Sequence, residues 1–470
     1  MASNILSRTD AEALVRRTLG FATADATRVN VVSGWSGNTR FAGGEITTAG
    51  GTTDTTVTVT STVGKKQAAA STNVLDDAAL RRTVELAERL ARLSPDDPEL
   101  MPPLAAQQYA TIPGAFAPSV ADLGPEARAL AVRRLLDAAR ERGTAAGIPA
   151  DDLFIGGFLE ANARAAAVGT SAGLFAYHTG TDVSLSNTVR TPDGTGSGYA
   201  SQGARDWNAL DPAALGRRAA DKGIASRNPQ AIEPGAYTVV LEPRAVADIL
   251  GSLTGSFNAR ATDEGRSPFS VRGGGTKVGQ KIADERVTLW SDPADPMLAT
   301  SPFDAEGQPV PRTTWIENGV LKGLAYSRYW AQRTGRQPTG GGGGGFGGPP
   351  GGLHMAGTDT SIEQLVAGTQ RGILVTRFWY IRFLDQRTVM VTGLTRDGTF
   401  LIENGKVTRP LRNFRFNESP LFMLNNLETL GVAERLAGTE SGGGIVMPAI
   451  KARDFNFTSL SEGGERVPGQ

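Results

Sequence analysis

Alternating polar and apolar residues in the first part of the chain predict long β-strands. Residues 28–33 alternate and predict a strand, Gly34–Asn38 predicts a turn, and a second strand follows to Phe41. Residues 55–63 (TTVTVTSTV) alternate with period 2 and carry β-branched side chains at most positions, which favours a strand. Residues 65–71 are expected to pair with that strand.

Apolar residues spaced by three and four positions predict four helices around these strands. The first, Asp10–Leu19, starts with Asp10 as its N-cap, and the second is Asp76–Leu93. The third runs from Pro125 to Arg142 with proline at its first position. The fourth follows Asp211, an N-cap aspartate with proline after it, and ends near residue 225.

The pattern changes after residue 235. Tyr237–Leu241 predicts a strand and Pro243–Thr254 an amphipathic helix, and short strands and hairpins follow. The tetrapeptide IENG occurs at 316–319 and again at 402–405. Asn-Gly between apolar stretches is the strongest short hairpin signal, because both turn residues need positive φ.

These patterns predict an α+β protein with two regions. Residues 1–228 form a helix-and-strand N-terminal region, with a sub-boundary in the proline-rich connector 95–124. Residues 229–470 form a strand-rich, partly barrel-like C-terminal domain. Residues 339–352, which contain six consecutive glycines, are expected to be a loop or internal linker.

Composition excludes several kinds of chemistry. The 470 residues include no cysteine and two histidines, His178 and His354. Thiolate catalysis, Cys-ligated zinc, iron–sulfur clusters and a three-histidine zinc site within the chain are therefore excluded. The 48 basic and 48 acidic side chains cancel, which argues against binding nucleic acid by bulk charge. No apolar stretch is long enough to span a membrane, and no signal peptide is evident, so we expect a cytoplasmic protein.

Three groups of residues are candidates for chemistry, each with a structural alternative. Ser171 lies in a G-x-S-x-G sequence, but a strand rather than a helix follows it, which favours a hairpin turn over a nucleophile. Asp304 and Glu306 could hold a divalent cation, although further ligands are lacking nearby. His354 follows the glycine tract, so His354, Gly341 and Gly343 are candidate substrate contacts.

Short motifs in a fixed order carry a family resemblance. After VVL (239–241) and its helix come the following segments: FN (257–258), SPF (267–269), GQKI (279–282), PFDAEG (302–307), WIENG (315–319), GTFLIENG (398–405) and PAI (448–450). Their order and spacing resemble the TldD/PmbA family, also called TldD/TldE. The N-terminal region, with residues 35–41 at its early strand turn, is similar to that family as well.

The resemblance implies a bacterial, cytosolic proteolytic system of two related chains. The TldD-type chain holds zinc through H-E-x-x-x-H on a helix and a downstream cysteine, with the glutamate as base for the metal-bound water. Here Val246 and Gly251 occupy the two histidine positions, and Ala247 occupies the position of the base. None can bind a metal or move a proton, so the chain resembles the zinc-free PmbA/TldE type.

The implied function is that of a non-catalytic subunit, with no cofactor of its own. Its expected partners are a zinc-containing TldD-like chain and extended or unfolded peptides, and neither nucleic acid nor a membrane. Two alternatives stay open: a self-associating (homodimeric) peptide-binding or scaffold protein without a proteolytic partner, and an independent hydrolase using Ser171 or carboxylates.

Overall fold

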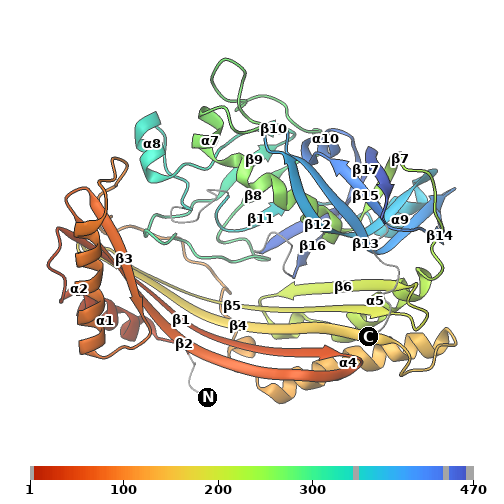
Figure 1. The fold of residues 1–470 in the computed structure, drawn as a ribbon, viewed down its shortest axis with the longest axis horizontal. Coiled ribbons are helices and arrows are strands. Elements are labelled where there is room, and N and C mark those ends of the chain that lie inside the picture. Colours follow the sequence, from red (N-terminus) through yellow and green to blue (C-terminus); the bar gives the residue numbers. More distant parts are fainter. Residues whose placement is uncertain (1–4, 342–348, 438–443, 462–470) are drawn as a thin grey trace.

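The structure, a computed structural model, describes residues 5–341, 349–437 and 444–461 and is a mixed α+β fold with two sheets. Figure 1 shows a long curved sheet from the first half of the chain, with the second half lying over its concave side. The chain passes from one part to the other through residues 226–234. Among the described helices, none combines the length and apolar character needed to cross a bilayer.

The first sheet is antiparallel, with strand order β3-β2-β1-β4-β5-β6. Its strands are β1 (Ala26–Ala42), β2 (Glu45–Val63), β3 (Lys66–Thr72), β4 (Phe154–Thr170), β5 (Phe175–Arg190) and β6 (Ser197–Ala204). As predicted, β2 pairs with β3, and β4 and β5 form a hairpin around 171–174.

The predicted turn at Gly34–Asn38 is wrong, because β1 runs straight through it. The reversal occurs instead at Gly43 and Gly44, whose φ angles are +62° and +78°. Two strands flank β1 along its length, and their ladder hydrogen bonds hold the glycines extended. Trp35 is buried within the same segment, so tertiary pairing overrides the local turn signal.

Helices cover the outer face of this sheet. They are α1 (Arg8–Leu19), α2 (Asp77–Leu93), α3 (Pro118–Ala121), α4 (Pro125–Ala145) and α5 (Pro212–Ala225), with a short 3₁₀ turn at Trp207–Ala209. The predicted cap Asp211 accepts the Ala214 N–H, and Asp76, predicted as the first residue of its helix, is instead the N-cap of α2 and accepts the Ala79 N–H. In α1 the N-cap is Ser7 rather than Asp10, because the Ser7 hydroxyl accepts the Asp10 N–H.

The second sheet surrounds the C-terminal core. Its strands are β7 (Gly235–Leu241), β8 (Leu289–Ser291), β9 (Thr313–Glu317), β10 (Val320–Leu321), β11 (Leu353–Met355), β12 (Arg371–Asp385), β13 (Met390–Glu403), β14 (Lys406–Pro410), β15 (Phe414–Glu418), β16 (Leu427–Leu436) and β17 (Ile445–Leu460). Five of them pair in a closed ring, β7-β12-β13-β15-β17-β7, so the predicted partial barrel is present. The accompanying helices are α6 (Pro243–Leu250), α7 (Ala259–Asp263), α8 (Arg328–Thr334), α9 (Ile362–Ala367) and α10 (Pro420–Asn425).

Both Asn-Gly hairpins form as predicted. Asn318 and Gly319 connect β9 to β10 with φ angles of 48° and 76°. Asn404 and Gly405 connect β13 to β14 with φ angles of 51° and 74°. Residues that tolerate positive φ fix both turns locally.

Candidate functional site

Helix α6, where the family resemblance places the metal ligands, is enclosed by the barrel. Val246, Ala247 and Gly251 are all fully buried, and α6 contacts β12 and β17. The predicted amphipathic pattern is present, since Arg244 and Asp248 share one side of the helix and the other side chains join the apolar core, but the barrel buries the polar side as well. The helix ends at Leu250, and a 3₁₀ segment follows to Phe257, where the Ser252 and Thr254 hydroxyls donate to carbonyls three residues back.

The side chains at these three positions do not fit a zinc ion. Zinc needs thiolate, imidazole or carboxylate donors, and valine, alanine and glycine provide none. Within the described residues, no group of three or more His, Cys, Asp or Glu side chains gathers as a metal site would require. The charged side chains of this helix are instead Arg244 and Asp248.

A buried acid and an arginine of α6 lie near an arginine of β12. Arg244 pairs with Asp248 at 2.9 Å, and the second carboxylate oxygen of Asp248 accepts the Phe378 N–H at 3.2 Å. Burial raises the pKa of Asp248 to about 6, and the guanidinium groups of Arg244 and Arg377 oppose that rise. This arrangement fixes α6 against β12 and leaves no open carboxylate for catalysis.

Tyr199 connects this network to the first sheet. Its ring lies 4.2 Å from the guanidinium carbon of Arg377 and 5.6 Å from that of Arg244. Arg377 also donates to Asp397 at 2.6 Å, and the Ser197 hydroxyl donates to the other oxygen of Asp397 at 2.5 Å. Because Tyr199 and Ser197 belong to β6, these bonds fasten the first sheet to the barrel.

His354 forms a separate polar pair with Asp295. Its ring stacks on Trp290 at 4.2 Å, and its Nδ1 lies 2.6 Å from a carboxylate oxygen of Asp295. Burial works to raise the pKa of Asp295, but the hydrogen bonds with His354 and the Met297 N–H outweigh it, so the pKa lies below its usual range. Gly341 ends a described segment and Gly343 lies outside the described residues, so their grouping with His354 stays a prediction.

The other candidates have structural roles. The Ser171 hydroxyl accepts the Thr27 N–H at 3.0 Å in the β4–β5 turn, and strands rather than a helix flank it. Asp304 accepts the N–H groups of Glu306 and Gln308, while Glu306 pairs with Arg328 at 3.0 Å. These contacts agree with the prediction of a hairpin turn at Ser171 and with a structural role for the two carboxylates in their loop.

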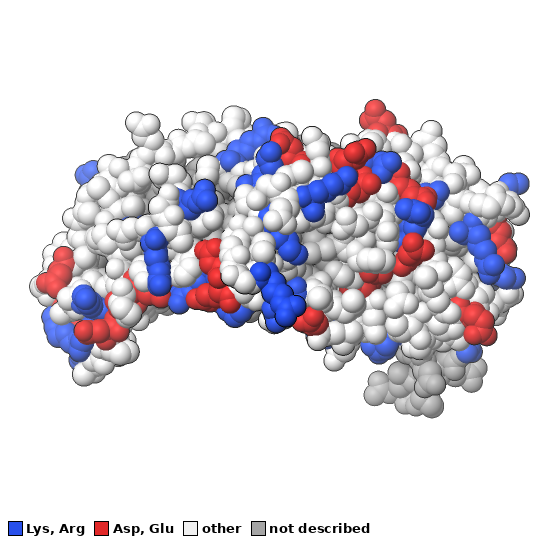
Figure 2. Space-filling view, turned by 90° about the horizontal axis from the view of Figure 1, so that it is seen from above, with Lys and Arg blue, Asp and Glu red and all other residues white. Residues whose placement is uncertain are grey.

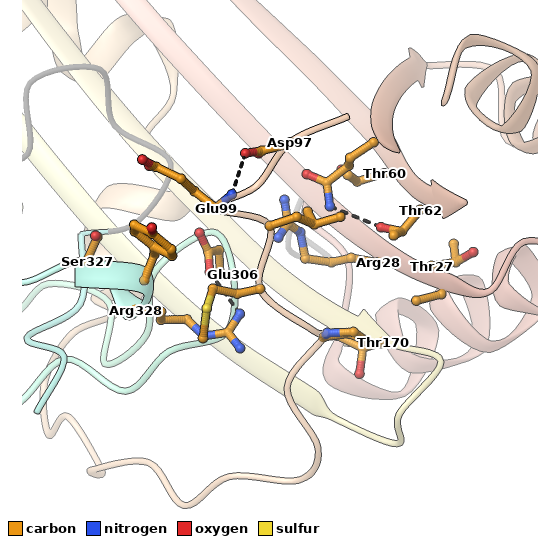
Figure 3. A pocket seen from close by; sticks show the side chains of 16 residues that line it. Thr27, Arg28, Thr60, Thr62, Asp97, Glu99, Thr170, Glu306, Ser327 and Arg328 are labelled. Atoms are coloured by element: carbon orange, nitrogen blue, oxygen red, sulfur yellow. Dashed lines mark hydrogen bonds and ion pairs between the residues drawn. The ribbon is translucent and has the colours of Figure 1, made fainter. Parts of the chain in front are cut away.

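A polar pocket that the sequence did not reveal lies where the two parts of the chain meet. Figure 3 shows Arg28 from β1 and Arg328 from α8 beside Asp97, Glu99 and Glu306. The cavity measures about 170 Å³. Two signals were present in the sequence: Glu306 was a candidate cation ligand, and the alternation of β1 places Arg28 on the face opposite its buried valines.

Three family models match the chain in order. Domain 1, the central domain and the C-terminal domain of the PmbA/TldA metallopeptidases match residues 28–91, 119–227 and 234–459. The fold and these matches therefore define a protein of a metallopeptidase class. The chain belongs to the PmbA/TldD family, as its motifs predicted.

Known relatives agree with this assignment. A metalloprotease of Methanothermobacter thermautotrophicus is 26% identical over 236 residues, which cover 47% of this chain and 48% of that protein. Metalloprotease PmbA of Escherichia coli O157:H7 is 24% identical over 246 residues, covering 51% of each. The chain thus spans about half the length of the curated relatives it matches.

Solved structures show the same fold over nearly the whole chain. TldE from Thermococcus kodakarensis superposes with a TM-score of 0.84 at 20% identity, covering 95% of this chain and 99% of that one. A putative modulator of a DNA gyrase from Thermotoga maritima gives a TM-score of 0.82 at 17% identity, covering 95% and 100%. At such identities the likeness establishes the fold alone.

Proposed function

We propose that this chain is the zinc-free subunit of a TldD/TldE-type metalloprotease complex that processes peptides or unfolded proteins in the cytoplasm. In this proposal the zinc belongs to a TldD-like partner chain. One observation supports it above others: in a metallopeptidase family, the helix expected to carry the ligands presents only Val246, Ala247 and Gly251, sealed in the barrel core. Activity by this chain alone would require a different metal site.

Exposed aromatic side chains at the end of the pair where β12 connects to β13 support a partner-binding role. We name residues 379–387 the aromatic ribbon. It exposes four large apolar side chains to between 38% and 55%, namely those of Trp379, Tyr380, Phe383 and Leu384. Aromatic residues together with arginine are enriched at protein interfaces, and clustered exposed apolar residues mark interaction sites.

Charge favours a different chain over a second copy as the occupant of the ribbon. Residues 379–396 contain Arg382, Arg387 and Arg396 but only one acid, Asp385. A two-fold contact between copies would bring like charges together. We therefore assign the ribbon to a TldD-like partner with acidic groups around an apolar groove. On the face seen in Figure 2, basic and acidic side chains are interspersed.

The test is to purify this chain alone and together with a TldD-like chain, and to measure mass, zinc content and cleavage of an unfolded protein. We expect a stable complex whose zinc and activity depend on the partner. A solitary chain that holds stoichiometric zinc and cleaves peptides would overturn the proposal. Self-association without any complex would favour the scaffold alternative.

The ribbon is tested in the same assay. Phe383→Ser with Leu384→Ser should weaken association at least tenfold, because both side chains leave an apolar contact. The matched control, Val278→Ser with Val407→Ser, removes two exposed apolar side chains elsewhere and should leave association unchanged. Equal affinity of the two double variants would exclude the ribbon from the interface.

A further inference from the structure

The pocket in Figure 3 is built by segments far apart in the sequence. Its walls come from the start of β1, the facing residues of β2, the connector 97–103, the loop at Glu306 and the start of α8. The first sheet contributes the floor and the C-terminal domain contributes one side. The pocket therefore exists only when the two parts are assembled.

Most charges in this pocket already have partners. Arg328 donates to Glu306 at 3.0 Å and to the Pro102 carbonyl at 2.6 Å. Glu99 accepts from Arg260 at 2.7 Å. These contacts neutralise the two glutamates and hold the connector against the C-terminal domain.

Arg28 differs from the other arginine of the pocket. Its Nε donates to Asn30 at 3.2 Å, but within the described part of the chain no carboxylate lies within ion-pair distance of its guanidinium. Burial lowers the pKa of Arg28, against the opposing effect of Glu306 and Asp304. The side chain extends into the group of residues drawn in Figure 3. A partly desolvated guanidinium without an ion pair favours an added anion, and its planar fork matches a carboxylate.

Two threonines of the neighbouring strands line the pocket beside Arg28. Thr60 lies opposite Arg28 in the β1–β2 register, and Thr170 lies opposite it in the β1–β4 register. Asp97 lines the same cavity, and its negative charge disfavours a dianion such as phosphate. At about 30 Å³ for each water, the cavity volume equals five or six waters, which suits one carboxylate-bearing residue rather than a folded segment.

We propose that this pocket binds a single carboxylate group of a peptide, either its C-terminus or an acidic side chain, through Arg28. The inference rests on the proposed function only in taking the ligand to be a peptide. The proposal gives this pocket a role in binding peptide that is separate from α6 and from the aromatic ribbon.

The experiment uses calorimetric titration of the full chain without a partner, so that it does not depend on complex formation. The probes are N-acetyl-trialanine with a free C-terminus, its C-terminal amide, and N-acetyl-Ala-Glu-Ala-amide. We expect the free acid, the glutamate peptide or both to bind at least tenfold more tightly than the amide. The better of the two identifies the source of the carboxylate.

Variants then locate the site. Arg28→Gln should weaken binding of the carboxylate probe at least tenfold, and Arg28→Lys should restore part of it, because lysine keeps the charge but not the fork. Arg164→Gln, which removes an exposed arginine from the same face of the sheet, should change nothing. Circular dichroism checks that each variant is folded.

Three results would overturn the inference. They are equal binding of the amide and the acids by the unaltered chain, unchanged binding in Arg28→Gln, and tighter binding of inorganic phosphate than of the peptide acids. The comparison of probes on the unaltered chain stands even if an Arg28 variant does not fold. Loss of complex formation with a TldD-like chain would affect the proposed function but not this result.

Discussion

Two buried acids of the barrel differ in what surrounds them. Asp248 lies between two arginines, whereas Glu418 accepts only backbone N–H groups, from Ser419 at 2.8 Å and Asn456 at 3.1 Å. Burial raises the pKa of Glu418 to about 7, and those two hydrogen bonds oppose the rise. Glu418 is therefore a titrating group within the wall between β15 and β17.

Glu418 should make the stability of the protein depend on pH. Its pKa of about 7 in the folded state exceeds the ordinary value of 4.5, so its contribution is complete below pH 4.5 and is lost as pH rises through 7. At about 1.4 kcal/mol for each pKa unit, the loss is about 3 kcal/mol. Glu418→Gln should reduce the slope of stability against pH and leave the part that Asp248 contributes, as measured by urea denaturation between pH 4.5 and 8.

Glutamine has one carbonyl oxygen for the two backbone N–H groups, so Glu418→Gln also changes the stability at every pH. The change of stability with pH is therefore the quantity to compare. Glu45→Gln, at an exposed strand end, is the control and should keep the slope of the unaltered chain. An unchanged slope in Glu418→Gln would show that Glu418 is ionised throughout this range.

Val246→His tests whether a single histidine is enough for α6 to bind zinc. The imidazole would enter a fully buried apolar site without a hydrogen-bond partner, so we expect a loss of about 2–4 kcal/mol in stability and no zinc uptake. Val32→His, on an exposed face of β1, should cost less than about 0.5 kcal/mol. Stoichiometric zinc in Val246→His would contradict this account of α6.

At the scale of elements, the contact between α4 and α5 depends on one glycine. A Cβ at Gly216 of α5 would collide with the backbone carbonyl of Leu135 in α4. The two helices cover the outer face of the first sheet together, and their contact is part of its core. At this position local helix propensity favours alanine, whereas packing against α4 requires glycine.

Gly216→Ala should destabilise the protein, although alanine favours a helix by about 1 kcal/mol over glycine. The backbone of α4 must shift to admit the methyl group, and overpacking of this kind costs about 1–3 kcal/mol. Thermal unfolding measures the change. Gly255→Ala, where a Cβ meets open space, should be neutral or slightly stabilising, and the same result at Gly216 would contradict the close packing.

At the scale of the molecule, a charged network joins the sheet to the barrel. Arg377 serves both parts, because it holds Asp397 within the barrel and stacks on Tyr199 of β6. Asp182 of β5 and Arg435 of β16 form a further pair across the junction. The pocket around Arg28 depends on the same placement of the two parts.

Arg377→Met should cost about 3–5 kcal/mol in stability, because it leaves the buried Asp397 with a weaker partner, Arg396 at 3.7 Å. Arg415→Met, at an exposed position of β15, is the matched control and should change stability by less than about 0.5 kcal/mol. Urea denaturation measures both. A loss below 1 kcal/mol in Arg377→Met would show that the two parts are held together by other contacts.

Sequence by itself determined the features that neighbouring residues decide. The cap at Asp211, the turns at Asn318 and Asn404, and the long alternating strands all follow from backbone preferences within a few residues. The order of the motifs also predicted the family, which the family models confirm, whereas the match of Val246, Ala247 and Gly251 to the ligand and base positions stays a prediction.

Tertiary structure decided what depends on distant segments. Pairing on both sides carried β1 through the predicted turn at Gly34–Asn38, and ring closure around α6 buried the face expected to be polar. The surroundings of Arg28, supplied by a connector and a loop far along the chain, were invisible in the sequence. The reason is physical, because burial and ion pairing are set by which segments meet, and a local pattern fixes conformation but not neighbours.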